Sequence, residues 1–278
     1  MCGIAGVFGV ENAAVAAVEA VKVLQHRGQD GCGAMSIDAA QKHHLVKSVG
    51  LVDDVFPDIN RIPELLPGNA AVAQVRYATT GAARESANSQ PLYRSIHGTP
   101  IGIVHNGNLE NYLQIRAGLE AEGVPFETTS DTEVFLQLMA RSSKPDVAGQ
   151  ILDACRQVKG AYSLLVLAPG RLIAVVDPLS FWPLSFAKYC GGWLFTSETC
   201  AMAALGQKSP VGDICAVDPG EIVEIDVGGV RRQTYARSMR ATPEPKPCNR
   251  FCIFSQIYLA RPDSENLHGL SVYRYRWR

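Results

Sequence analysis

The feature that most constrains this chain is its first nine residues, MCGIAGVFG. A cysteine follows the initiator methionine directly, and a run of small and apolar residues follows the cysteine. This run predicts a strand over residues 3–9. Whatever the remainder of the chain folds into, Cys2 stands at the start of a strand.

Cys2 carries unusual chemistry if Met1 is removed, which a side chain as small as that of Cys2 permits. A thiol attacks as thiolate, and a free pKa of about 8.5 leaves only a few per cent ionised at neutral pH. An α-amine titrates near about 7.7 to 8.0, so it can accept the thiol proton and later return it to a leaving amine. Cys2 is therefore a candidate nucleophile with its own base, or else one more small apolar residue at a strand start.

Length and composition exclude several classes of protein. The 278 residues suffice for one large domain, or for a domain plus a piece of another. The formal net charge of -1 gives no sign of nucleic-acid binding. Eight cysteines without paired C-x-x-C spacing argue against zinc and a disulfide framework. Because no stretch reaches the roughly 18 apolar residues of a membrane helix, we expect a cytoplasmic protein with no membrane partner.

Strand and helix patterns are interspersed along the chain. Pro169-Gly170 separates two apolar runs and predicts a hairpin, which favours layered α+β architecture with largely antiparallel sheets. Ser130 and Glu133 predict a helix-capping box. The predicted strands are 3–9, 33–38, 44–49, 70–79, 101–105, 163–168, 172–177, 193–197 and 221–227, and the predicted helices are 12–26, 109–122, 131–142, 147–158 and 198–205.

The texture of the chain changes beyond about residue 237. The segment ATPEPKPC, residues 241–248, is proline-rich and predicts an extended linker. The segment FCIFSQIYLA, residues 251–260, predicts one or two strands, and the residues after it are too few to close a second core. We therefore expect one domain over residues 1–236, and a linker with the truncated start of another domain over residues 237–278.

Three polar side chains and one glycine have the chemistry needed to split the side-chain amide of a free amino acid. Asn106 could supply an amide and Gly107 a backbone N–H to stabilise an oxyanion, where one such donor typically contributes about 3 to 4 kcal/mol. Arg76 could bind a carboxylate, and Asp131 could accept from an ammonium group. Taken singly, each also has an ordinary structural interpretation. Arg76 could form a surface salt bridge, Asn106-Gly107 could form a turn, and Asp131 could interact with a helix dipole.

Taken together and in order, the motifs resemble the class II glutamine amidotransferases, which are N-terminal-nucleophile hydrolases. The match is best to the branch linked to a phosphoribosyltransferase, because HRGQD and ARPDS follow that branch and disfavour the sugar-phosphate aminotransferases and asparagine synthetases. The motifs are M-C-G-I-x-G, L-Q-H-R-G-Q-D-G-C-G, V-R-Y-x-T-x-G with N-S-Q-P, H-N-G-N-L-x-N, S-D-T-E, T-S-E-T-C-A and C-I-F-S-Q-I-Y-L-A-R-P-D-S.

The resemblance implies a four-layer αββα sandwich with mostly antiparallel sheets, and a role for each matching residue. No metal or cofactor is implied. The implied residues are Cys2 as nucleophile, Asn106 and Gly107 as oxyanion hole, Arg27 and Gly28 in the turn over the terminal amine, Arg76, Tyr77 and Thr79 in the loop that binds glutamine, and Asp131 at the substrate ammonium.

The implied reaction is hydrolysis of L-glutamine to glutamate and ammonia through a thioester on Cys2, with the ammonia destined for phosphoribosylamine in purine synthesis. We expect the acceptor half to be missing here and to be supplied by a separate phosphoribosyltransferase chain, and we expect a homo-oligomer. The alternative is a catalytically silent remnant, or a glutamine-binding regulatory module.

Three positions depart from the pattern of the resembled branch: Ser180 replaces glycine, Trp182 replaces arginine and Ser255 replaces glutamate. A glycine in such a turn usually supplies a special backbone angle, so we expect Ser180 to cost stability. Cys252 lies near where some relatives bind an iron–sulfur cluster, and we expect no cluster here.

Overall fold

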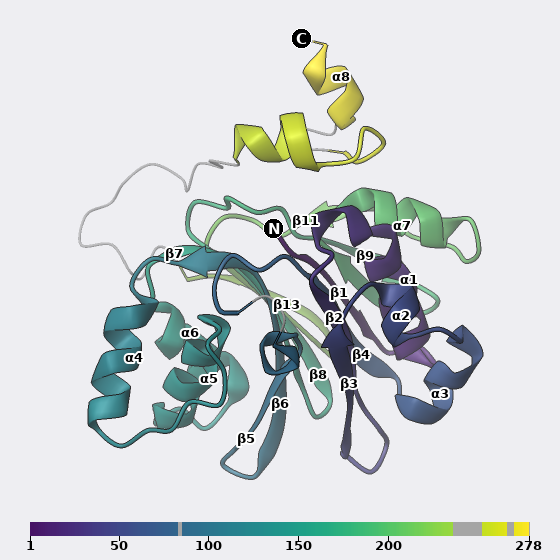
Figure 1. The fold of residues 1–278 in the computed structure, drawn as a ribbon. Coiled ribbons are helices and arrows are strands. Elements are labelled where there is room, and N and C mark those ends of the chain that lie inside the picture. Colours follow the sequence, from purple (N-terminus) through teal and green to yellow (C-terminus); the bar gives the residue numbers. More distant parts are fainter. Residues whose placement is uncertain (83–84, 236–251, 266–269, 278) are drawn as a thin grey trace.

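The computed structural model describes residues 1–82, 85–235, 252–265 and 270–277. Two sheets face each other, and helices cover the outer face of each (Figure 1). Every strand pairing within the two sheets is antiparallel. The seven-stranded sheet runs in the order β11 (Cys215–Ala216), β9 (Ser185–Tyr189), β10 (Gly192–Thr196), β1 (Gly3–Phe8), β4 (Ala70–Arg76), β2 (Gly31–Ile37) and β3 (His43–Val49). The six-stranded sheet runs in the order β13 (Gly229–Thr234), β12 (Glu221–Asp226), β8 (Arg171–Val176), β7 (Gly160–Ala168), β6 (Thr99–Leu109) and β5 (Leu92–Ile96).

The helices form the two outer layers. The seven-stranded sheet is covered by α1 (Ala13–Val23), α2 (Val52–Val55), α3 (Ile62–Leu65) and α7 (Thr199–Gly206). The six-stranded sheet is covered by α4 (Tyr112–Ala121), α5 (Thr132–Arg141) and α6 (Val147–Cys155). The C-terminal part of the description holds a short π-helix, η5 (Ser255–Leu259), and α8 (Val272–Arg276). The αββα sandwich with antiparallel sheets is thus confirmed.

The position of β1 determines where the chain begins. Its six residues are all buried, and it pairs with β4 on one side and β10 on the other. Gly3 lies opposite Val75, and Ala5 lies opposite Thr196. Between the sheets, Phe195 and Leu165 are fully buried in the central apolar layer. The chain therefore begins in the middle of the seven-stranded sheet, with Cys2 buried next to the end of β4.

The segment predicted as one or two strands over 251–260 is helical instead. Residues Ser255–Leu259 form a π-helical turn, closed by a hydrogen bond of 2.7 Å from Ala260 N to Ser255 O. In the described part of the chain, no strand pairs with this segment. Because a strand must share its backbone hydrogen bonds with a neighbour, an apolar run without one satisfies them locally.

Two smaller expectations have different outcomes. The hairpin across Pro169-Gly170 is confirmed, since β7 and β8 pair directly. The capping box is wrong, because Glu133 accepts from the backbone of Glu127 and Thr128 rather than from Ser130. Backbone N–H groups of the loop before α5 thus occupy both oxygens of the Glu133 carboxylate, which therefore does not cap the helix. The proposed linker over 241–248 lies outside the described residues.

Ser180 occupies the special backbone angle expected of glycine. Its φ is 50°, and its buried hydroxyl has no hydrogen-bond partner among the described residues. Left-handed backbone costs a non-glycine residue roughly 1 kcal/mol or more.

We predict that Ser180→Gly raises the free energy of unfolding by about 0.5 to 1.5 kcal/mol, because glycine relieves the strain and removes the unpaired hydroxyl. Urea denaturation followed by circular dichroism measures the change. The control is Ser95→Gly in edge strand β5, where glycine should destabilise by about 0.5 to 1 kcal/mol. Equal destabilisation by both substitutions would contradict the strain.

Candidate active site

Cys2 lies at the inner end of β1, with its side chain against the backbone that follows β4. The residue is 8% exposed. Tyr77 N donates to Cys2 Sγ at 3.4 Å, and the thiol lies 3.6 Å from Tyr77 O. Burial raises the pKa of the thiol above its ordinary value. A thiol in this position needs a base before it can attack, since burial disfavours the thiolate.

The terminal amine has the opposite shift. Burial, and to a smaller extent the charge of Arg27, lower the pKa of the Met1 α-amine to about 6. An amine with this pKa is mainly unprotonated at neutral pH and can accept a proton. The amine that loss of Met1 would expose on Cys2 lies one residue closer to Arg27 and the thiol.

Arg27 and Gly28 form the turn that packs against the first residues of the chain, at the end of η1 (Gln25–Arg27). Arg27 is 1% exposed, and its Nε donates to Cys2 O at 2.9 Å. A Cβ at Gly28 would lie 2.5 Å from the carbonyl carbon of Arg76. Only glycine allows this turn to approach the end of β4 so closely. Arg27 thus contacts the backbone of the candidate nucleophile itself.

The loop after β4 is held by its own backbone and by Asp30. Arg76 Nη2 donates to Thr80 O at 3.0 Å, and Nη1 donates to Ala82 O at 3.2 Å. The side chains of Tyr77 and Thr79 are exposed. Asp30 Oδ2 accepts from Ala78 N at 2.7 Å. The loop is therefore tied down at its base, while the side chains of Tyr77 and Thr79 face solvent.

Asn106 and Gly107 lie on β6 in the other sheet. Asn106 is 0% exposed, and neither its Oδ1 nor its Nδ2 has a hydrogen-bond partner among the described residues. Such a buried amide is costly to leave unpaired and occurs mostly where function requires it. A Cβ at Gly107 would lie 2.0 Å from Ala161 O on β7. Glycine is required there by the close approach of the backbone.

Several contacts bring the two sheets together at this end. Gln74 on β4 donates through Nε2 to His105 O on β6 at 2.7 Å. Thr80 Oγ1 donates to Asn108 Oδ1 at 2.5 Å. Asp131, at the start of α5, accepts from Leu109 N at 2.9 Å.

Two of the predicted site residues influence the pKa of the Cys2 thiol. The positive charge of Arg76 lowers the pKa of the Cys2 thiol and the negative charge of Asp131 raises it, although burial outweighs both. The structure thus brings Arg76 at the end of β4 and Asp131 at the start of α5 near Cys2, while Asn106 and Gly107 lie on β6 of the facing sheet.

Sequence reasoning missed Asp30, Thr80 and Glu198. Asp30 stands within HRGQD and Glu198 within TSETCA, so both lay inside quoted motifs without being singled out. Glu198 Oε1 accepts from Arg27 Nη1 at 2.5 Å and lies 3.1 Å from His26 Nε2. Burial alone would raise the pKa of Glu198, but the hydrogen bond from His26 and the charge of Arg27 hold it well below its usual range.

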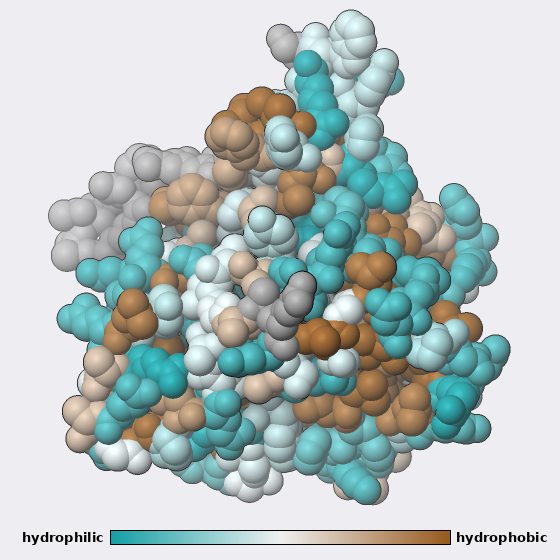
Figure 2. Space-filling model, viewed as in Figure 1, coloured by the Kyte–Doolittle hydropathy of each residue, from teal (hydrophilic) through white to brown (hydrophobic). Residues whose placement is uncertain are grey.

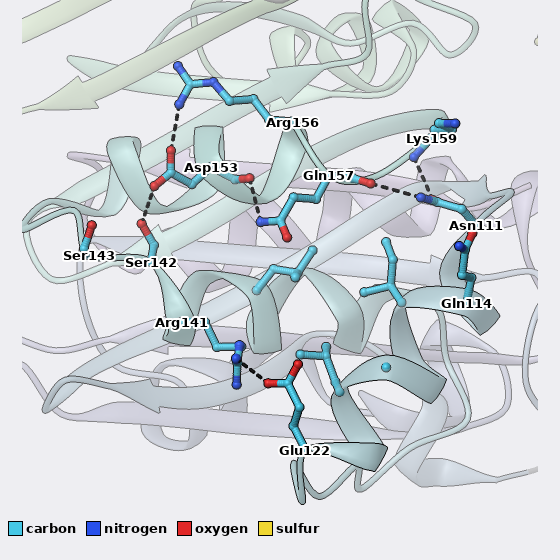
Figure 3. A pocket seen from close by; sticks show the side chains of 14 residues that line it. Asn111, Gln114, Glu122, Arg141, Ser142, Ser143, Asp153, Arg156, Gln157 and Lys159 are labelled. Carbon is cyan, nitrogen blue, oxygen red and sulfur yellow. Dashed lines mark hydrogen bonds and ion pairs between the residues drawn. The ribbon is translucent and has the colours of Figure 1, made fainter.

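A wide groove of about 970 Å³ lies elsewhere, between α4, α5 and α6. Two ion pairs line it, Glu122 with Arg141 and Asp153 with Arg156 (Figure 3). None of the predicted site residues lines it. Among the described residues, no cluster of three or more His, Cys, Asp or Glu side chains could hold a metal ion. Within the same residues, no helix is both long and apolar enough to cross a bilayer.

The class of protein follows from this fold and from comparison with known families. A family model described as a glutamine amidotransferase domain matches residues 76–204. That range contains the β4 loop, Asn106, Gly107 and Asp131. Residues 76–204 of this chain are therefore similar to a glutamine amidotransferase domain.

Its homologues within this class are amidophosphoribosyltransferases. Amidophosphoribosyltransferase 2, chloroplastic, of Arabidopsis thaliana is 37% identical over 276 residues, which are 99% of this chain and 46% of that protein. The Bacillus subtilis (strain 168) enzyme is 33% identical over 276 residues, covering 99% and 54%. A solved structure of glutamine phosphoribosylpyrophosphate amidotransferase from B. subtilis, complexed with ADP and GMP, matches with a TM-score of 0.85, 33% identity and coverage of 99% and 56%. The chain thus spans about half the length of its curated relatives, and the resemblance in the sequence is confirmed.

We predict that Gly107→Ala destabilises the domain by at least about 2 kcal/mol, because the added Cβ would collide with the backbone of β7. Chemical denaturation measures this change. The matched control is Gly118→Ala in α4, where a Cβ meets no atom within 4 Å and alanine should stabilise the helix by about 0.5 to 1 kcal/mol. A neutral Gly107→Ala would show that the backbone contact is not tight.

Proposed function

We propose that this chain hydrolyses L-glutamine to glutamate and ammonia through a γ-glutamyl thioester on Cys2. The observation that carries the proposal is a buried Cys2 thiol directly beside the chain terminus, where burial already lowers the pKa of the Met1 α-amine to about 6. The thiol cannot ionise readily alone, and the amine is ready to take its proton. The unpaired amide of Asn106 supports the same reaction from the facing sheet.

The steps follow from these groups. The α-amine of Cys2, free after loss of Met1, takes the thiol proton, and the thiolate attacks the γ-carbonyl carbon of glutamine. A carbon–sulfur bond forms, and negative charge develops on the carbonyl oxygen. The side-chain amide of Asn106 and the backbone N–H of Gly107 would donate to that oxygen.

Collapse of this intermediate breaks the carbon–nitrogen bond. The ammonium group of Cys2 returns its proton to the leaving nitrogen, and ammonia departs. Water, deprotonated by the same amine, then attacks the thioester and breaks the carbon–sulfur bond. Glutamate leaves, and the thiol recovers its proton.

The ends of glutamine would be recognised by charge. Arg76, already oriented by two backbone carbonyls, would bind the α-carboxylate, and Asp131 would accept from the α-ammonium. Tyr77 and Thr79 would contribute as part of the exposed loop beside them. Arg27 and Gly28 would hold the first residues of the chain rather than touch the substrate.

The ammonia would serve a phosphoribosyltransferase domain that makes phosphoribosylamine, carried on the same polypeptide or another. The support is the similarity to amidophosphoribosyltransferases and an apolar surface on the C-terminal segment. Ile253, Phe254 and Ile257 are 51%, 69% and 56% exposed, and the brown area on the upper part of Figure 2 lies over η5. We propose that this face packs against that domain in the cytoplasm, within a homo-oligomer.

We expect Cys2→Ala to lower the rate of glutamate release at least 1,000-fold, because the nucleophile is lost. A coupled assay for glutamate measures it. The control is Cys215→Ser at an exposed cysteine, which should retain the parent rate. If Cys2→Ala keeps the parent rate, the reaction does not use this thiol. If the parent chain binds glutamine without hydrolysing it, the chain is a glutamine-binding module.

We expect kcat/KM to rise with pH through an apparent pKa well below the ordinary 7.7 to 8.0 of a terminal amine. Burial lowers the pKa of the Met1 α-amine, and the amine exposed on the buried Cys2 would share this environment, so its base form would persist to lower pH. A pH–rate profile on the chain lacking Met1 measures it. An acidic limb centred near pH 8 would contradict an amine in this environment.

A further inference from the structure

One buried carboxylate connects the first residues of the chain to the C-terminal segment. Glu198 follows β10, is the N-cap residue of α7 and is 4% exposed. Its Oε1 accepts a hydrogen bond from Arg27 Nη1 and lies 3.1 Å from His26 Nε2. Its Oε2 accepts from Arg261 N at 3.0 Å and from Ser264 Oγ at 2.8 Å. The two oxygens of one carboxylate thus serve two different parts of the molecule.

The first part includes the candidate nucleophile. Arg27 donates to Glu198 through Nη1 and to Cys2 O through Nε, so one guanidinium links the carboxylate to the backbone of Cys2. Ser197, which precedes Glu198, holds the start of β1 through two hydrogen bonds to the backbone of Ile4. Ser197 Oγ accepts from Ile4 N at 3.0 Å, and Ser197 N donates to Ile4 O at 3.0 Å.

The second part is the segment 260–265 (Figure 1). Besides its two hydrogen bonds to Glu198, this segment donates from Glu265 N to Thr199 Oγ1 at 2.7 Å. Its other side supports α8, since Val272 N donates to Ser264 O at 2.7 Å. Ser264 is therefore fixed between α8 and the Glu198 carboxylate.

We propose that Glu198 is a positioning residue for Cys2, and that the segment 260–265 orients the nucleophile by holding the Glu198 carboxylate in place. This inference rests on the proposed glutaminase function. It adds that the C-terminal segment, far from the thiol in sequence, contributes to the rate of the reaction.

The physical argument concerns a buried charge with few ways to be satisfied. Arg27 is fully buried, and Glu198 is the carboxylate that neutralises it. If Oε2 loses a donor, the carboxylate gains freedom to rotate, and Arg27 loses the fixed partner that directs its Nε toward Cys2 O. Small displacements of a nucleophile cost much rate, because the reacting atoms must be aligned.

The test compares three variants of the full chain, with active sites counted by labelling with a diazoketone analogue of glutamine. Ser264→Ala removes one donor to Glu198 and leaves Arg27 and Cys2 unchanged. Glu198→Gln removes the charge that Arg27 requires. The matched control is Ser271→Ala, because Ser271 caps the adjoining helix α8 and does not contact Glu198.

We expect Ser264→Ala to lower kcat per labelled site about tenfold and Glu198→Gln to lower it about 100-fold, while KM for glutamine changes less than twofold. Counting sites separates this effect from unfolding, which would reduce the number of labelled sites and not the turnover of each. If Glu198→Gln does not fold, Ser264→Ala decides the question. Ser271→Ala should retain the parent kcat.

Parent kcat in the Ser264→Ala and Glu198→Gln variants would overturn the inference, as would a rise in KM alone. An equal loss in Ser271→Ala would also overturn it, because the effect would then be general loosening of the segment. If the parent chain itself neither hydrolyses glutamine nor becomes labelled, the proposed function fails instead, which is a separate result.

Discussion

The structure depends on the burial of the chain's own beginning. β1 is a fully buried strand within the seven-stranded sheet, hydrogen-bonded to β4 and β10. A strand with neighbours on both sides has its register determined by both, so Cys2 is fixed relative to the ends of β4 and β10. The loop at 76–81 and the turn at 197–198 are the segments that hold the first residues.

Burial acts on the two ionisable groups of the terminus in opposite directions. It raises the pKa of the Cys2 thiol and lowers the pKa of the terminal amine. Each shift has the same cause, since a low-dielectric environment disfavours whichever form is charged. In the proposed reaction the thiol would keep its proton until the terminal amine removes it, and the fold would need no other base for this step.

Much of the fold follows from local pattern, because strands and helices with strong periodicity depend on few long-range contacts. The helices at α1, α5 and α6 and the hairpin at Pro169-Gly170 were predictable for this reason. The strands β5, β9, β11 and β13 were missed, and 251–260 was predicted as strand, because pairing depends on which neighbour is present. No local pattern carries that information.

Some residues of the candidate site were likewise predictable from the sequence, and others were not. Motif order singled out Cys2, Arg76, Asn106 and Asp131, and the fold brings Arg76 and Asp131 near Cys2, with Asn106 on β6 of the facing sheet. Glu198 could not be found by local reasoning, since its partners Arg27 and Ser264 are 171 and 66 residues away in sequence. A buried carboxylate becomes recognisable as part of the site only when its donors are known.

The central claim is that the N-terminus forms an assembled nucleophile, and intact-mass spectrometry tests it most directly. The purified protein is weighed before and after treatment with a diazoketone analogue of glutamine, which alkylates a thiol that the pocket positions. The account predicts a chain lacking Met1 that gains one adduct, mapped to Cys2 and blocked by excess glutamine. A chain that retains Met1, or gains no adduct that glutamine prevents, would contradict it.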